Sequence, residues 1–76
     1  MTEQEWRKEF ARAVRVRMRR KNMTQKELAE EADISEQNMS KYMKCYRTPR
    51  PDKIIRIAKA LECTTDELIV FDDDLD

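Results

Sequence analysis

The side chains best suited to recognition chemistry lie in the segment from Ser35 to Lys44. Its apolar residues, Met39, Tyr42 and Met43, share one face if the segment is a helix. The opposite face then carries hydrogen-bond donors and acceptors of the kinds that can pair with base edges in the major groove of DNA. These side chains are Glu36, Gln37, Ser40, Lys41 and Lys44. The segment therefore has the character of a groove-reading helix.

A second short helix is expected directly before this segment. Thr24 and Glu27 form a capping box, in which the hydroxyl accepts a hydrogen bond from a backbone N–H and the carboxylate reaches back. Asp33 ends this helix, and Ser35 can cap the next one. A turn of about three or four residues is the length found in a helix-turn-helix unit. We expect the pair to cross, with Leu28, Ala29, Ala32 and Ile34 turned inward.

Further helices are expected on either side of this pair. The first runs from about Glu3 to Lys21 after a capping box of Thr2 and Glu5. Its apolar residues recur every fourth position, which is the spacing of a buried helical stripe. They are Trp6, Phe10, Val14 and Met18, with Ala13 beside them.

Two helices are expected after the groove-reading segment. Pro51 suits the first position of a helix that ends near Leu61. Thr64 and Glu67 form a third capping box, which opens a short last helix. In the helix that starts at Pro51, we expect Ile54, Ile55, Ala58 and Leu61 to be buried and Ile57 to be partly covered. The sequence thus predicts an all-α fold of five helices around one core, with residues 1–71 as a single domain and residues 72–76 as a flexible acidic tail.

The charges balance over the chain but are segregated along it. Lysine and arginine total 16, and aspartate and glutamate also total 16, so the formal net charge is zero. The segment 12–21 has six bases and no acid, 41–59 has seven bases and one acid, and 62–76 has seven acids and no base. A local field depends on this distribution rather than on net charge. Partners that carry negative charge are therefore not excluded.

Several function classes lack the residues they need. The chain has no histidine and no glycine, so it offers neither a glycine-rich phosphate loop nor a nucleophile with a visible base, and we expect no enzyme activity. Cys45 and Cys63 have no metal-ligand spacing, so free thiols and neither cofactor nor metal are expected, with a redox role left open. Since no apolar run approaches about 18 residues, we expect a soluble, cytoplasmic protein without a membrane partner.

Several segments, in order, resemble the Cro/repressor-type helix-turn-helix family, also called the xenobiotic-response-element (XRE) family. They are Met23 to Ala29, Asp33 to Ser35, Met39 to Tyr42, Arg47 to Pro49 and Ile57 to Leu61. The resemblance covers residues 10 to 70, approximately. It implies a compact lambda-repressor-like domain that binds double-stranded DNA with sequence specificity and regulates transcription, with repression as the expected mode.

The resemblance also implies particular contact residues. Glu36, Gln37 and Lys41 match the family's base-contacting positions. Gln37 suits adenine and Lys41 suits guanine, whereas Glu36 either accepts from cytosine or only favours the helix N-terminus electrostatically. The residues expected to contact phosphates are Gln25, Ser35, Asn38, Lys44, Arg47 and Arg50. Two alternatives stay open: Ser35 is wholly used as a cap, and Gln25 is merely solvated.

The chain departs from the family pattern at two sets of positions. The family commonly has glycine where this chain has Asn22, Asp33, Cys45 and Glu62. Cys45 and Glu62 tolerate a positive φ poorly, so their turns are expected to differ from the family geometry. Met18 and Met43 replace an arginine and a glutamate that form a partly buried ion pair in many relatives. We predict that the two methionines touch.

Two questions about partners stay open. Relatives of this size usually bind as symmetric dimers, and Leu68, Ile69, Val70 and Phe71 form either a dimer surface or part of the core. The arginines 12, 15 and 19 form either a solvated face or a source of phosphate attraction. The alternative function is a protein-interaction module, antirepressor or antitoxin-like, with weak or no DNA binding. It is suggested by the acids Glu30, Glu31, Asp33 and Glu36.

Overall fold

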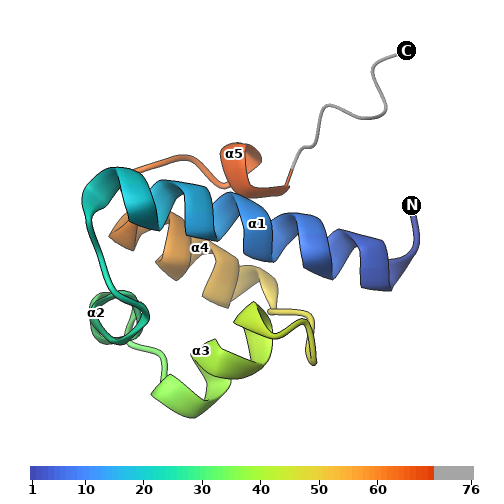
Figure 1. The fold of residues 1–76 in the computed structure, drawn as a ribbon, viewed down its shortest axis with the longest axis horizontal. Helices are drawn as coiled ribbons and strands as arrows, with labels where there is room; N and C mark the ends of the chain where they lie inside the picture. The colour runs from blue at the N-terminus through green and yellow to red at the C-terminus, as the bar shows by residue number, and fades with distance from the viewer. Residues whose placement is uncertain (70–76) are drawn as a thin grey trace.

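The structure, a computed structural model, describes residues 1–69, which form five α-helices and no strand (Figure 1). The helices are α1 (Glu3–Lys21), α2 (Gln25–Ala32), α3 (Glu36–Met43), α4 (Pro51–Ala60) and α5 (Asp66–Ile69). The all-α prediction is confirmed. Val70, Phe71 and the expected tail of residues 72–76 lie outside the described residues.

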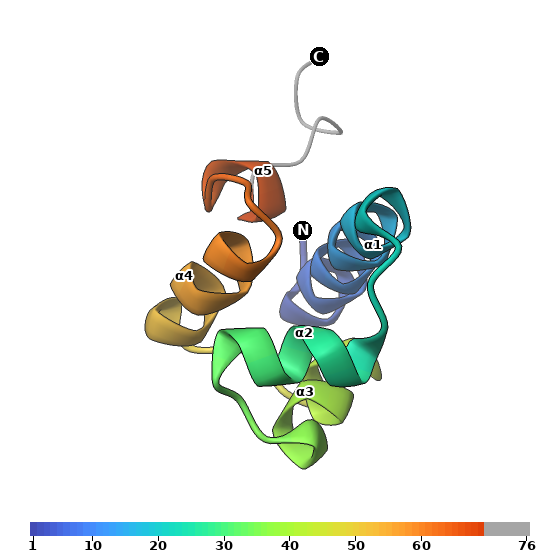
Figure 2. The same ribbon diagram turned by 90° about the vertical axis from the view of Figure 1, so that its left-hand side faces the viewer.

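The long helix α1 forms one side of the molecule and α4 the other (Figure 2). Figure 2 also shows α2 below and between these two helices, with α3 directly beneath it and in contact with it. Contacts join α2 to α4 and α3, and join α1 to α3 and α5. The pair α2–α3 therefore packs on α1 and α4, since α3 contacts α1 and α2 contacts α4.

Side-chain caps begin four of the helices where the sequence predicts them. Thr24 Oγ1 accepts from the Glu27 N–H at 3.1 Å, and the Glu27 carboxylate accepts from the Thr24 N–H at 2.8 Å. The same reciprocal pair of bonds occurs at Thr2 and before α5. Ser35 caps α3 alone, by accepting from the Asn38 N–H at 3.1 Å. Each cap satisfies backbone donors that the first helical turn leaves without partners.

The core contains most of the residues expected from α1, α2 and α3, whereas Ala13 and Met18 are only partly buried and pack against it. Phe10 and Val14 of α1 are buried, whereas Trp6 is partly buried and its ring stacks on that of Phe10 at 5.3 Å between centroids. Ala11, which the stripe did not include, is also fully buried. The other confirmed core residues are Leu28, Ala29, Ala32, Ile34, Met39, Tyr42 and Met43.

The inward face predicted for α4 is correct at Ala58 and Leu61, but the roles of Ile55 and Ile57 were exchanged, and Ile54 is only partly buried. Ile57 is completely buried, whereas Ile55 keeps 46% of its surface exposed. Because successive residues of a helix are turned by about 100°, Ile57, Ala58 and Leu61 form one face that packs on α2 and the core. Ile55 lies outside that face. A run of three isoleucines within four residues could not reveal which of them points inward.

The turns that were expected to deviate keep left-handed geometry. Cys45 has φ 66° and Glu62 has φ 57°, close to the 55° and 56° of Asn22 and Asp33. After each of the four, the next backbone N–H bonds to a carbonyl oxygen five residues back, at 2.9–3.0 Å. This bond belongs to the Schellman motif and satisfies a carbonyl at the helix end. It offsets a conformational cost of about 1–2 kcal/mol for a residue with a Cβ.

Candidate nucleic-acid interface

The exposed face of α3 carries the three predicted base-contacting residues. Glu36, Gln37 and Lys41 are all exposed, while Met39, Tyr42 and Met43 of the same helix are buried. Within residues 1–69, the side chains of Glu36, Gln37 and Lys41 make no hydrogen bond or ion pair. Their polar groups are thus available to an external partner. Figure 1 shows α3 at the edge of the molecule, away from α5.

Both ends of α3 are fixed. At its beginning, Ile34 is buried and Ser35 caps the helix. The backbone carbonyl oxygen of Asp33 also accepts a hydrogen bond from Arg56 of α4, at 3.4 Å. At its end, an N–H of the Arg15 guanidinium donates to the carbonyl oxygen of Met43 at 2.8 Å. The exposed face of α3 is therefore held in one orientation by contacts with α1, α2 and α4.

The loop after α3 is tied to the beginning of α1. Arg7 Nε donates to Thr48 Oγ1 at 2.7 Å, and Thr48 Oγ1 donates to the Glu3 carboxylate at 2.6 Å. Arg7 also pairs with Glu3 at 3.1 Å and donates to the Cys45 carbonyl oxygen at 3.5 Å. The hydrogen bond from Thr48, followed by Arg7, lowers the pKa of Glu3. The network is centred on residues that no local sequence pattern connects, and sequence reasoning missed it.

The predicted phosphate-contacting residues lie on the helices and the loop that these contacts fix. Lys44, Arg47 and Arg50 are exposed on the loop, and Gln25 is exposed at the first position of α2. Asn38 is partly buried on α3. The oxygen of Ser35 is used as the cap of α3, but its hydroxyl proton remains available for donation. The beginning of α2 and the end of α3 meet, since Gln25 and Met43 line one hollow.

That hollow also contains Met18 and Met43, the two methionines that were predicted to touch. Met18 and Met43 both line it, as do Arg15, Arg19, Met23 and Gln25, and its volume is about 250 Å³. The two methionines therefore lie near each other, in agreement with the sequence argument. Direct contact between them stays a prediction. Replacing a buried ion pair with apolar side chains is often neutral or stabilising.

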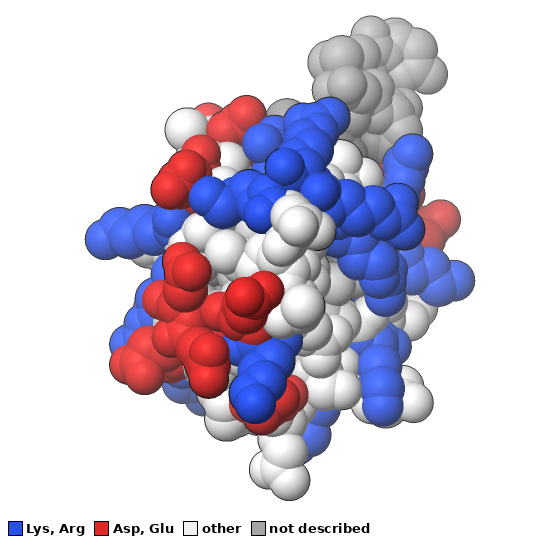
Figure 3. Space-filling view, turned by 60° about the vertical axis from the view of Figure 1, so that its left-hand side comes forward, with Lys and Arg blue, Asp and Glu red and all other residues white. Residues whose placement is uncertain are grey.

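Acidic residues are exposed close to the same surface. Glu27, Glu30 and Glu31 are exposed on α2, and Asp33 and Glu36 on the turn and at the start of α3. Figure 3 brings the side that carries α2 forward and shows acidic side chains gathered at its left, with basic side chains along its top and right. An anionic partner would therefore meet favourable charge on only part of this side.

Comparison with known families identifies the fold. A family model described as the Cro/C1-type HTH DNA-binding domain matches residues 13–74. The chain belongs to this family. No curated protein and no solved structure matches the chain. In this Cro/C1-type domain, α2 and α3 are the helix-turn-helix, and DNA is the partner that the family implies. The match begins after Arg7, so Arg7 and Glu3 lie outside it, whereas their partners Cys45 and Thr48 lie within it.

The described part of the Cro/C1-type domain does not provide the whole predicted dimer surface. Leu68 is fully buried in the core, which favours the core alternative for this residue. Ile69 is partly buried and packs against the core. Val70 and Phe71 lie outside the described residues. In this structure, core packing therefore accounts for the first half of this apolar segment.

Residues 1–69 of the chain also bear on the metal, membrane and thiol predictions. No group of three histidine, cysteine, aspartate or glutamate residues there could hold a metal ion. No helix in this range combines the length and the apolar character needed to cross a membrane. Cys45 and Cys63 are free thiols, and burial raises the pKa of Cys63.

Proposed function

We propose that this Cro/C1-type domain is a sequence-specific DNA-binding transcriptional regulator that places α3 in the major groove. One observation carries the proposal: α3 presents Glu36, Gln37 and Lys41 outward, without partners among the described residues, from a helix whose two ends are fixed. A rigid helix with free donors and acceptors is what direct base readout requires.

Each of these side chains suits a different base. The amide of Gln37 can pair with N6 and N7 of adenine, and the ammonium group of Lys41 can donate to guanine. The carboxylate of Glu36 can accept from N4 of cytosine. A good pairing of this kind contributes about 1–3 kcal/mol of discrimination against a wrong base. Glu36 would also repel phosphates, so it disfavours sites that offer it no donor.

Backbone contacts would flank the groove on both sides. We assign phosphate contacts to Gln25 at the start of α2, to Ser35 and Asn38 at the start of α3, and to the loop. The loop residues are Lys44, Arg47 and Arg50. Such contacts fix the position of the domain on the duplex and carry no sequence information. The Arg7–Thr48 hydrogen bond supports this assignment because it holds the loop against α1.

Repression is the proposed mode of regulation. A domain that occupies the major groove at a promoter excludes other proteins from it, and this would take place in the cytoplasm. Binding as a symmetric dimer would place two copies of α3 about 34 Å apart, one turn of the duplex. The dimer contact would involve residues beyond Leu68, since Leu68 itself is buried.

A protein-interaction module is the second candidate. The exposed acids on α2 and at the start of α3 favour it, because DNA phosphates would be repelled by them. The partner would be a basic protein surface. This candidate predicts little or no retention of DNA at any ionic strength.

A salt series separates the two candidates. The affinity for duplex DNA is measured between low and physiological salt for the wild-type chain, for Lys41→Ala and for Lys59→Ala. Lys59 is exposed on α4 and serves as the charge-matched control. DNA binding should weaken steeply with salt, because bound counterions are released. Lys41→Ala should weaken binding more than Lys59→Ala. Absence of retention at low salt would transfer the assignment to the protein-interaction module.

A further inference from the structure

The hollow between α1 and the start of α2 has an apolar floor and a cationic rim. Met18, Met23 and Met43 contribute the apolar part, and Arg15, Arg19 and Gln25 contribute the polar part, around a volume of about 250 Å³. Two arginines are among its lining residues, and no acidic residue is. No acidic side chain of the hollow therefore neutralises the positive charge of Arg15 and Arg19.

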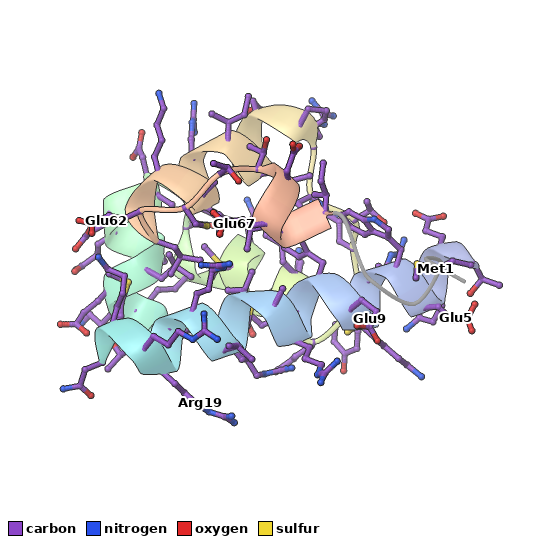
Figure 4. All side chains as sticks on the ribbon, turned by 90° about the horizontal axis from the view of Figure 1, so that it is seen from above. Met1, Glu5, Glu9, Arg19, Glu62 and Glu67 are labelled. Carbon is purple, nitrogen blue, oxygen red and sulfur yellow. The ribbon has the colours of Figure 1, made fainter. Side chains whose placement is uncertain are left out.

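The two arginines retain unused hydrogen-bond donors. Arg15 is exposed and uses one terminal nitrogen to hold the Met43 carbonyl oxygen. Because a guanidinium has five N–H donors, others remain. Arg19 is exposed, and its side chain makes no hydrogen bond or ion pair within residues 1–69. Figure 4 shows its side chain extending outward from α1. Both groups can thus bind an anion without breaking a contact of the fold.

The position of the hollow indicates which anion would reach it. Gln25 is the first residue of α2 and Met43 is the last residue of α3, so the hollow adjoins both helices of the helix-turn-helix. A duplex that receives α3 in its major groove brings a phosphate strand along the border of that helix pair. Guanidinium groups bind phosphate with two parallel hydrogen bonds, which makes arginine well suited to this contact.

We propose that this hollow seats a phosphate of the DNA backbone, held by Arg19 and by the free edge of Arg15. The inference rests on the proposed DNA-binding function and adds a contact from α1 to those assigned to α2, α3 and the loop. Arg15 then touches the DNA backbone and the end of α3 at the same time. Phosphate binding and the orientation of the groove-reading helix are thereby linked through one side chain.

The test compares Arg19→Ala with Arg20→Ala. Both residues are exposed on the last turn of α1, but only Arg19 lines the hollow. The affinity for one duplex is measured across a salt series. Arg19→Ala should lower the affinity about tenfold at low salt and reduce the slope of log K against log salt by about 1. Arg20→Ala should change the affinity by about twofold or less, since it removes only a screened charge.

Ethylation interference on the same duplex locates the phosphate. Ethylation of one backbone phosphate should weaken binding of the wild-type chain and should have no further effect on Arg19→Ala. If the wild-type chain binds the duplex, and Arg19→Ala and Arg20→Ala have the same affinity and the same salt slope, the inference is overturned while the proposed function stands. If the wild-type chain binds no duplex at low salt, both are overturned.

Discussion

The guanidinium of Arg15, on α1, donates a 2.8 Å hydrogen bond to the backbone carbonyl oxygen of Met43, the last residue of α3. The final carbonyl groups of a helix have no partner within it, and the negative end of the helix dipole favours a cation there. The bond therefore caps α3 from another helix. It fixes α3, the helix proposed to enter the major groove, by a contact between residues 28 positions apart in the chain.

Arg15→Ala should lower the free energy of unfolding by about 1 kcal/mol, the usual contribution of one hydrogen bond. Urea denaturation, monitored by circular dichroism, measures this free energy of unfolding. Arg12→Ala is the matched control, because the Arg12 side chain is 76% exposed and, among residues 1–69, pairs only with Glu9, at 3.6 Å. Equal stabilities of the two variants would show that the bond to Met43 does not hold α3.

The orientation of α4 can be tested by two alanine substitutions. Ile57→Ala should lower the free energy of unfolding by about 2–5 kcal/mol, because it leaves a cavity at a fully buried position of the core. Ile55→Ala should cost about 1 kcal/mol or less, because almost half of that side chain is already in water. The free energies of unfolding from urea titrations provide the comparison. The reverse order of the two costs would mean that α4 is rotated.

The left-handed turn at Cys45 predicts a stabilising substitution. Cys45→Gly should raise the free energy of unfolding by about 0.5–1 kcal/mol, since glycine avoids the Cβ penalty of a positive φ but has more freedom in the unfolded chain. The backbone carbonyl that accepts from Arg7 is retained. Cys45→Ala keeps the Cβ and is the control. Equal midpoints of urea denaturation for Cys45→Gly and Cys45→Ala would argue against a left-handed conformation at residue 45.

Stability should fall in acid. Hydrogen bonds from the backbone and hydroxyl of Thr64, together with Arg17, lower the pKa of Glu67 from its ordinary 4.5, and capping hydrogen bonds also lower the pKa of Glu5 and Glu27. The unfolded chain then binds more protons than the folded chain, so stability rises with pH through this range. It is fully present above 4.5 and is lost as the pH falls through the native pKa values.

Melting temperatures measured at pH values from 6 down to 3, roughly, would check this linkage. Glu67→Gln should melt with a weaker dependence on pH than the wild-type chain, because one of the shifted carboxyl groups is gone. An unchanged dependence would show that Glu67 keeps an ordinary pKa in the folded state.

Local signals in the sequence were sufficient for most of the fold. The capping boxes at Thr2, Thr24 and Thr64 were recognised because their partners lie three residues apart. The apolar spacing in α2 and α3 identified which face of each helix is buried, and so which face of α3 is exposed.

Tertiary contacts were not predictable in the same way. Arg7 and Thr48 are 41 positions apart, and no spacing rule connects them. Arg15 appeared only as one member of a basic run, and its bond to a backbone oxygen leaves no signature in the side-chain pattern. The turn at Cys45 was misjudged because residue preference opposes a positive φ, while the backbone hydrogen bond that stabilises the turn depends on the helix before it.

Selection from a randomised duplex pool at low salt, carried out with the wild-type chain and with Gln37→Ala, tests the central claim most directly. We expect the wild-type chain to enrich a defined sequence, and Gln37→Ala to lose the preference at one adenine position while it retains the others. If the wild-type chain enriches no sequence, or if Gln37→Ala selects the same site with the same preferences, α3 does not read the groove as proposed.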